Sequence, residues 1–348
     1  MVLLKKNVAI FGTGSYMTSK VKAIREKFNI MCFADNDSSK WGAKIHGIDI
    51  INPKELKNYQ WDNIIIASSY FFEISKQLVN MGIDNTDILL LQNFKPYSEE
   101  EKLFFRQGNE QFFIDTRGNA CFKNDLININ FYTMDDYYVI KEIFADGVYD
   151  FNDYSDNEYS VIDIGMNIGT ASIYFASKSN VKNVYSFEPF SETFNLALNN
   201  ISINDVIGKK VHSYRYGLSN ADKNISLFYN ENQKSGMSTQ EDINTKFCGN
   251  SNEKQEICLK DSGNIINKII QENNNSKFIL KVDCEGEEYN IFKRLNEIGI
   301  VGKFQIIMLE WHYQGSELLE TILKENKFIY FKFVRDIDTG VIYAIKSN

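Results

Sequence analysis

Two stretches of the chain share one pattern, in which a short apolar run enters a glycine-bearing turn and a helical pattern follows. In the first, Val8–Phe11 lead into a turn that contains Gly12 and Gly14. In the second, residues 159–163 lead into a turn that contains Gly165 and Gly169. Apolar strands that alternate with helices are typical of a parallel sheet with helices on both faces. The sequence therefore predicts an α/β protein with two doubly wound domains.

The first domain is expected to cover residues 1–97. Its predicted strands are residues 7–11, 30–34, 45–51, 63–67 and 88–91, and its predicted helices are residues 18–28 and 72–81, with a short helix from Pro53. Residues 98–150 form a charged and aromatic connector or lid, with a helical pattern at residues 135–144. The connector is expected to pack on the domain that follows it.

The second domain is expected to cover residues 151–348 and to contain seven strands. They are residues 159–163, 183–187, 210–216, 278–282, 304–309, 328–334 and 341–345, with helices at residues 170–177 and 191–200. The last two strands flank Asp338–Gly340, a turn sequence that favours an antiparallel hairpin. A Rossmann-like parallel sheet that ends in a hairpin is typical of class I S-adenosylmethionine (SAM)-dependent methyltransferases. Residues 224–230 suggest a hairpin-like insertion, and residues 231–262 form an insertion with no assigned motif.

Composition narrows the class of protein. The 348 residues are 43% apolar and 24% charged, as in ordinary globular proteins, and two domains fit this length. The net charge of −8 and the pI of about 5.2 argue against a nucleic-acid partner, because phosphate neutralisation needs clustered Lys and Arg. Five scattered cysteines without a CxxC pair predict reduced thiols in a cytoplasmic protein. No apolar run reaches the length of about 18 residues that a transmembrane segment needs.

The second glycine turn carries the pattern of a SAM site. Gly165 and Gly169 allow the backbone to approach a ligand closely, and the helix that follows offers free N–H groups. Asp163 precedes the turn, and an acid there would repel a pyrophosphate but suits the ammonium group of SAM. Glu188 closes the next strand, where a carboxylate can accept both ribose hydroxyls. These features favour SAM over a nicotinamide dinucleotide.

Polar residues follow two later strands at the edge where ligands bind in open parallel sheets. They are Lys281, Asp283, Glu285, Glu310 and His312. Methyl transfer to a hydroxyl needs an aligned nucleophile and benefits from a base. His312 is the natural neutral base near pH 7, Asp283 is its natural carboxylate partner, and Lys281 is expected to contact substrate or orient the acids.

The same residues raise the question of a metal. Asp283, Glu285, Glu310 and His312 are also candidates for a divalent metal site, although their spacing fixes no coordination geometry. The next two acids, Glu287 and Glu288, are expected to be solvated residues at a helix start. The base and any metal requirement stay open at this point.

Five segments resemble the FkbM family of SAM-dependent methyltransferases, in order, over about residues 130–348. They are VIDIGMNIGTASIYFA, VYSFEPFSETFNLALNN, YGLSN, LKVDCEGEEYNIF and IIMLEWH. Members of this family mostly methylate oxygen atoms of sugars, polyketides and related products. The resemblance implies that SAM is held by Asp163, Gly165, Asn167, Gly169 and Glu188, and that Leu218, Ser219 and Asp283 line the same cleft.

The first domain resembles small Rossmann-like domains of bacterial sugar-modifying enzymes, some of which bind a nucleotide-sugar. That role would place Gly12 and Gly14 near a diphosphate and Asp35 near a ribose or base. Met17 stands where the dinucleotide fingerprint has its third Gly or Ala, which argues against a working NAD site. A docking or dimerisation module without a ligand is the alternative.

The sequence as a whole predicts an O-methyltransferase that acts on a hydroxyl of a sugar or sugar-linked intermediate in surface-polysaccharide biosynthesis. Its expected partners are SAM and a small-molecule or glycan acceptor, with a nucleotide-sugar and a homo-oligomer as further candidates and with no nucleic acid. Three alternatives remain. One is a nicotinamide-dependent sugar oxidoreductase that uses the first domain, and another is a scaffold that binds SAM or a nucleotide-sugar without chemistry. The third keeps the methyl transfer but has a phosphate-linked group or a lipid headgroup as the acceptor.

Overall fold

The computed structural model describes residues 5–68, 70–90, 111–151, 157–230, 236–248, 253–336 and 338–347. The chain divides into two compact units, which are treated separately below. Unit 1 contains residues 1–125 and 130–133, and unit 2 contains residues 126–129 and 134–348. The described part of the predicted connector is thus shared between the two units, while residues 98–110 lie outside the described residues.

Unit 1 is built on a six-stranded sheet of order β3-β4-β2-β1-β5-β6, parallel apart from the β3–β4 pair. Its strands are β1 (Asn7–Phe11), β2 (Asn29–Ala34), β3 (Lys44–Ile45), β4 (Ile48–Ile51), β5 (Asn63–Ile66) and β6 (Ile88–Leu90). Its helices are α1 (Ser15–Lys27) and α2 (Phe71–Asn80), with 3₁₀ turns η1 (Ser38–Lys40), η2 (Pro53–Asn58) and η3 (Asn85–Asp87). The α/β order predicted from the apolar pattern is confirmed.

Packing accounts for two positions of the first glycine turn. Gly12 has φ +102°, and a Cβ there would meet the carbonyl oxygen of Ala67 at 2.8 Å. Met17 is completely buried and packs with Val8, Ile10 and neighbouring residues in the core of unit 1. The glycine and the methionine are therefore explained by the close approach of β1, α1 and β5, without a ligand.

A three-stranded sheet follows in the chain. It has the order β7-β8-β9 and consists of β7 (Gln111–Ile114), β8 (Ala120–Lys123) and β9 (Asn128–Phe131).

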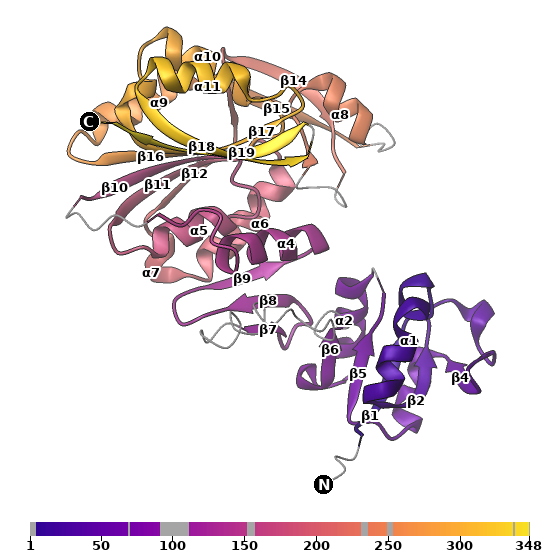
Figure 1. The fold of residues 1–348 in the computed structure, drawn as a ribbon. Coiled ribbons are helices and arrows are strands. Elements are labelled where there is room, and N and C mark those ends of the chain that lie inside the picture. Colours follow the sequence, from indigo (N-terminus) through magenta and orange to yellow (C-terminus); the bar gives the residue numbers. More distant parts are fainter. Residues whose placement is uncertain are drawn as a thin grey trace. The chain divides into compact units, whose positions relative to one another are not determined.

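Unit 2 has a seven-stranded sheet of order β12-β11-β10-β16-β17-β19-β18 (Figure 1). The strands are β10 (Tyr159–Ile164), β11 (Val181–Phe187), β12 (Val211–Tyr214), β16 (Lys277–Val282), β17 (Phe304–His312), β18 (Phe328–Asp336) and β19 (Thr339–Lys346). The neighbouring strands β12, β11, β10, β16 and β17 pair in parallel, in that order. Strand β19 is antiparallel to both β17 and β18. The predicted Rossmann-like sheet with a terminal hairpin is confirmed.

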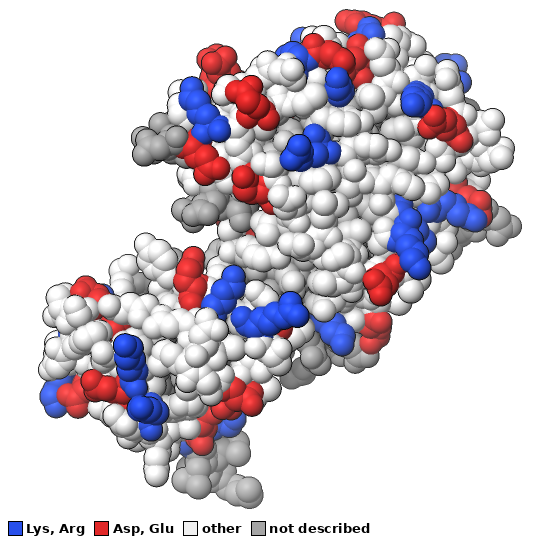
Figure 2. Space-filling model, turned by 180° about the vertical axis from the view of Figure 1, so that it is seen from behind, with Lys and Arg blue, Asp and Glu red and all other residues white. Residues whose placement is uncertain are grey.

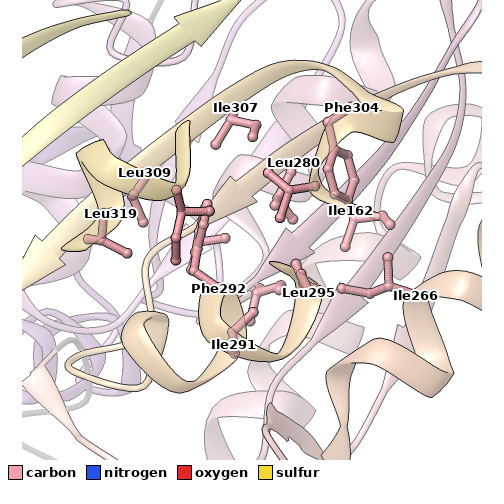
Figure 3. Packing of buried hydrophobic residues seen from close by; sticks show 14 of the residues in the cluster. Ile162, Ile266, Leu280, Ile291, Phe292, Leu295, Phe304, Ile307, Leu309 and Leu319 are labelled. Carbon is pink, nitrogen blue, oxygen red and sulfur yellow. The ribbon is translucent and has the colours of Figure 1, made fainter. Parts of the chain in front are cut away.

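Helices cover both faces of this sheet (Figure 1). One face is covered by α9 (Ser262–Glu272), α10 (Glu288–Glu297) and α11 (Glu317–Glu325), and the other by α5 (Thr170–Ser177), α6 (Ser191–Ser202) and α7 (Asp205–Gly208). Helix α4 (Met134–Phe144) packs against α5. In the largest core cluster, Phe292 and Leu295 of α10 lie against Leu280 of β16 and Ile307 of β17 (Figure 3).

Several elements of unit 2 are absent from the sequence prediction. No helix is predicted for the polar-rich segments of α9 and α11, and only the start of α10 is expected, although each of the three buries an apolar stripe. The insertion contains α8 (Glu241–Cys248) and β15 (Lys254–Asp261). Strand β15 pairs with β13 (Gly217–Ser219) and antiparallel with β14 (Lys223–Phe228), so the predicted local hairpin at residues 224–230 is wrong. The predicted strand 210–216 also ends early, at Tyr214.

Surface charge agrees with the acidic composition. On the face in Figure 2, acidic and basic side chains are interspersed and no single basic area dominates. Within the described ranges, no helix has the length and hydropathy needed to cross a bilayer.

The α10 contact predicts a large packing effect. Phe292 is completely buried, so Phe292→Ala should lower the free energy of unfolding by about 3–5 kcal/mol. Phe333 is 64% exposed, and Phe333→Ala should change it by about 0.5 kcal/mol or less. Urea unfolding followed by circular dichroism measures both, and equal losses would contradict this description of the core.

Candidate active site

The turn between β10 and α5 is held in an unusual backbone conformation. Gly165, Asn167 and Gly169 have φ values of +82°, +50° and +88°, a region that glycine and asparagine tolerate best. A Cβ on Gly165 would overlap the carbonyl oxygen of Asp283 after β16. The close approach of these two segments therefore requires glycine at position 165, and it brings Asp283 beside the turn.

A buried ion network lies beneath this turn. Lys281, in β16, is 2% exposed, and its Nζ lies 3.1 Å from Asp163 Oδ1 and 3.8 Å from Asp283 Oδ2. The same Nζ donates to the carbonyl oxygen of Gly165 at 2.7 Å, and Ser172 donates to Asp163 Oδ2 at 2.5 Å. Burial alone would lower the pKa of Lys281, but the two carboxylates outweigh burial and raise it. Lys281 thus joins β10, the glycine turn and the acids after β16.

A first cavity, the donor cavity, opens beyond the carboxyl ends of β10, β11 and β16. It has a volume of about 70 Å³, or about 600 Å³ with the open space at its mouth. Among its lining residues are Gly165, Asn167, Glu188, Leu218, Asp283 and Glu285.

Glu188 and two orphaned oxygens give the donor cavity its polarity. Glu188 accepts hydrogen bonds from the backbone N–H groups of Asn167 (3.0 Å) and Phe190 (3.1 Å). Burial raises the pKa of Glu188 to about 7 despite these hydrogen bonds. Asn167 Oδ1 and Thr239 Oγ1 are buried without a hydrogen-bond partner among the described residues. A ligand with an ammonium group and ribose hydroxyls would satisfy such acceptors, so the residues present fit SAM.

A second cavity, the acceptor cavity, shares a wall with the first. It has a volume of about 240 Å³, and Gly165, Asn167, Asp283 and Glu285 line both cavities. Its other polar lining residues are Glu142, Tyr149, Lys281, Glu310 and Arg335. The shared wall places two carboxylates between a donor site and a polar acceptor site.

His312 lies behind this wall within a group of carboxylates. Glu288 accepts from the backbone N–H of His312 at 2.6 Å and lies 3.2 Å from its Nδ1. The Nε2 atom is 3.8 Å from Glu285 and 3.6 Å from Glu310. Burial alone would lower the pKa of His312, but these carboxylates raise it to about 11. These carboxylates favour the charged form of the ring and so argue against a neutral His312, and its role as the base stays a prediction.

The two acids after Gly286 are also corrected. Glu287 and Glu288 are 1% and 0% exposed, not solvated. Glu287 accepts from Ser219 and from Gln240, while Glu288 holds His312. Both act inside the site because α10 begins against the sheet rather than at the surface.

Three residues predicted to hold SAM lie outside the donor-cavity lining. Asp163 is completely buried in the ion network with Lys281, so it shapes the turn and does not face the cavity. Gly169 caps α5, and Ser219 is completely buried. The predicted contacts of Gly165, Asn167, Glu188, Leu218 and Asp283 with the cavity agree with its lining.

In unit 1, the carboxylate of Asp35 accepts hydrogen bonds from neighbouring residues of the same unit. It is 8% exposed and accepts from the backbone N–H groups of Thr13 (3.0 Å) and Asp37 (2.9 Å) and from Lys40 (3.1 Å). Gly14 precedes α1 as its N-cap residue. A nucleotide-sugar at Gly12, Gly14 and Asp35 stays a prediction.

A metal also stays a prediction. Ligand atoms of Asp283, Glu285 and His312 all lie within 4.8 Å of one another, and Glu310 is next to His312. The site contains enough carboxylate oxygens for a hard divalent cation. The protonated His312 is a poor ligand as it stands, since a metal-bound imidazole must be neutral at the ligating nitrogen.

Some functional residues have no sequence signal. Glu142 in α4, Tyr149 and Arg335 in β18 line the acceptor cavity, yet none belongs to a recognisable motif. Tyr149 Oη lies 3.4 Å from Asp283 Oδ2, and burial raises the pKa of this tyrosine. These residues come together only because α4 and the hairpin meet the strand ends.

The chain is similar to known methyltransferases in sequence. Residues 163–335 match the family model of the FkbM methyltransferase domain, and residues 4–89 match the C2185-like N-terminal family. "Methyltransferase 1" of Beauveria bassiana is 27% identical over 168 residues, which cover 46% of this chain and 67% of the relative. "Methyltransferase sdnD" of Sordaria araneosa is 24% identical over 215 residues, which cover 55% of this chain and 81% of the relative. An FkbM methyltransferase structure from Methylobacillus flagellatus is 12% identical with a TM-score of 0.39, covering 97% of this chain and 90% of its own.

The seven-stranded sheet of unit 2 with its terminal hairpin is the Rossmann-like fold of class I methyltransferases. The chain is a SAM-dependent methyltransferase that carries an FkbM methyltransferase domain over residues 163–335.

The ion network predicts a strong effect on stability. Lys281→Met leaves the buried carboxylate of Asp163 unpaired and should lower the free energy of unfolding by about 3–5 kcal/mol. Lys277→Met, on the exposed end of the same strand, should have little effect, and Lys281→Met/Asp163→Asn should recover part of the loss. Thermal unfolding measures the stability of the three variants. A Lys281→Met protein as stable as the wild type would show that the ion network does not stabilise the fold.

Glu188 predicts a pH dependence of ligand binding. With a pKa of about 7, Glu188 loses its proton as the pH rises from 6 to 8, and the carboxylate is the stronger acceptor for ribose hydroxyls. The affinity for S-adenosylhomocysteine should therefore rise over this range. Glu188→Gln should remove the rise and weaken binding at pH 8 about tenfold, or about 1.4 kcal/mol. Calorimetric titration measures the affinity, with Glu192→Gln at an exposed position as the control. The same pH dependence in both variants would contradict the role of Glu188.

Proposed function

We propose that this enzyme transfers a methyl group from SAM to a hydroxyl group of a sugar or sugar-linked intermediate, in the cytoplasm, during surface-polysaccharide biosynthesis. The observation that carries the reaction type is the wall of Gly165, Asn167, Asp283 and Glu285 shared by the donor and acceptor cavities. A hydroxyl that enters the acceptor cavity meets carboxylates at the boundary with the donor site. The biosynthetic setting rests on the resemblance of the first domain to those of sugar-modifying enzymes.

The lining of the acceptor cavity supports a polyhydroxyl acceptor. Glu142, Asp283, Glu285 and Glu310 offer carboxylate oxygens, which accept hydrogen bonds from hydroxyl groups. Arg335 and Lys281 supply donors in the same cavity. An acceptor with several hydroxyls can form hydrogen bonds with both kinds of group. The free Cys32, Cys121, Cys258 and Cys284 support a reducing compartment.

The residues of the shared wall suggest how the reaction proceeds. SAM supplies an electrophilic methyl group on a positively charged sulfur. With SAM held in the donor cavity, the acceptor hydroxyl would receive this methyl group with S-adenosylhomocysteine as the leaving group, and the carboxylate of Glu285 would take the hydroxyl proton. Glu285 faces both cavities, and its side chain is held by Tyr313 Oη at 3.1 Å. Positioning of the hydroxyl against the methyl group is the second contribution of the acceptor cavity.

Glu285 stands in a strained backbone conformation. Its φ of +54° is uncommon for a residue with a side chain, and Gly286 follows at +106°. The backbone carbonyl of Glu285 accepts a hydrogen bond from Ser238. Such strain is concentrated at functional sites, where it fixes the direction of a side chain.

The role of Glu285 is tested by removing its charge without changing its shape. Glu285→Gln should lower kcat about 10²–10⁴-fold on an accepted sugar, because the proton acceptor is lost. Binding of S-adenosylhomocysteine should stay near that of the wild-type protein. Glu317→Gln, at the start of α11, is the control and should retain turnover.

The experiment uses a panel of sugars and nucleotide-sugars with radiolabelled SAM. Methylation of at least one sugar hydroxyl supports the proposed acceptor class. The proposed acceptor class would be overturned if the enzyme methylated only nitrogen atoms or only acceptors that lack several hydroxyls. If Glu285→Gln turned over at the wild-type rate, Glu285 would not be the base, and another group of the shared wall would have that role.

A further inference from the structure

The terminal hairpin leaves an apolar surface beside the acceptor cavity. On β18, Ile329, Phe331 and Phe333 are 72%, 64% and 64% exposed, and Ile345 of β19 is 57% exposed. These are large apolar side chains on the last two strands of the sheet, where burial would be expected. A contiguous exposed apolar surface of this kind marks a binding site more often than chance.

The apolar surface lines a groove of ligand size. The groove has a volume of about 630 Å³, within the range of roughly 300–1,000 Å³ found for small-molecule sites. Met308, Tyr343 and Ile345 belong to its lining on β17 and β19, and Phe331 and Phe333 to its lining on β18. The ring of Phe331 stacks on that of Tyr343, with centroids 4.9 Å apart, so the groove is built on packed side chains.

The groove adjoins the acceptor cavity. Glu142 and Arg335 line both. Arg335 bridges them, since its Nη2 lies 2.9 Å from Glu142 and its Nη1 lies 3.1 Å from Glu310. Phe331, Phe333 and Arg335 all line the groove, so its β18 side changes from apolar rings to a charged guanidinium. A ligand along this face would meet apolar contacts first and hydrogen-bonding groups next.

We infer that the acceptor is amphipathic: its hydroxyl-bearing head enters the acceptor cavity, and an apolar group attached to the head lies in the groove against Phe331 and Phe333. A glycoside of an alkyl, prenyl or aryl alcohol has this chemistry. The inference rests on the proposed function for the head group and adds the tail. Burial of the tail supplies affinity that the polar head, which exchanges water for protein contacts, supplies only weakly.

Two glucosides that differ only in their apolar group test the inference. The full-length protein, saturated with S-adenosylhomocysteine, is titrated calorimetrically with n-octyl β-D-glucopyranoside, below its micelle-forming concentration, and with methyl β-D-glucopyranoside. The octyl glucoside should bind at least tenfold more tightly. Equal affinities would overturn the inference.

Matched variants locate the binding of the octyl group. Phe331→Ser/Phe333→Ser should abolish the preference for the octyl glucoside, whereas Ile329→Ser should keep it, because Ile329 lies on the same face of β18 outside the groove lining. Glu310→Gln should weaken both glucosides to a similar degree. The inference would be overturned if Ile329→Ser lost the preference for the octyl glucoside as completely as Phe331→Ser/Phe333→Ser. It would also be overturned if Glu310→Gln changed the affinity for neither glucoside.

The occupant of the groove is distinguished by molecular mass. Sedimentation equilibrium should give the same mass for the wild-type protein and for Phe331→Ser/Phe333→Ser. A wild-type dimer that dissociates in this variant would instead assign the groove to a second copy of the chain. The proposed function fails separately, when no sugar is methylated, whereas the inference fails when sugars are methylated or bound without regard to their apolar group.

Discussion

A lysine buried near the carboxyl end of a parallel strand is the constraint on which the site depends. Lys281 and Asp163 are register partners on β16 and β10, so the cation and its counter-charge lie side by side in the sheet. The ammonium group also holds the carbonyl oxygen of Gly165. Since a buried charge without a partner is costly, the two strands, the glycine turn and the acids after β16 are fixed together.

This arrangement gives the enzyme two cavities with one common wall. The donor cavity takes its polarity from Glu188 and from buried oxygens without partners, and the acceptor cavity takes its polarity from carboxylates and two cations. Because Gly165 has no side chain, Asp283 can approach the turn and belong to both cavities. The two cavities are therefore brought together by backbone packing, and the hairpin adds an apolar groove next to the second of them.

The imidazole of His312 has a role that its sequence context conceals. A histidine two residues after a glutamate at a strand end resembles a base with a carboxylate partner. In the fold, Glu288 of α10 and Glu285 approach from a different segment, and three carboxylates around one buried ring favour the imidazolium. The same ring places its Nε2 beside both Glu285 and Glu310.

The sequence by itself determined the α/β class, the two sheets, the terminal hairpin and the contact of Gly165, Asn167, Glu188 and Asp283 with one cavity. Those features follow from local apolar runs and from glycine turns, which are written in consecutive residues. Tertiary structure decided which side of the turn Asp163 faces, the charge of His312, the burial of Glu288 and the recruitment of Arg335. These depend on which distant segments meet, and charge and burial are properties of the assembled neighbourhood and not of a residue's place in the chain.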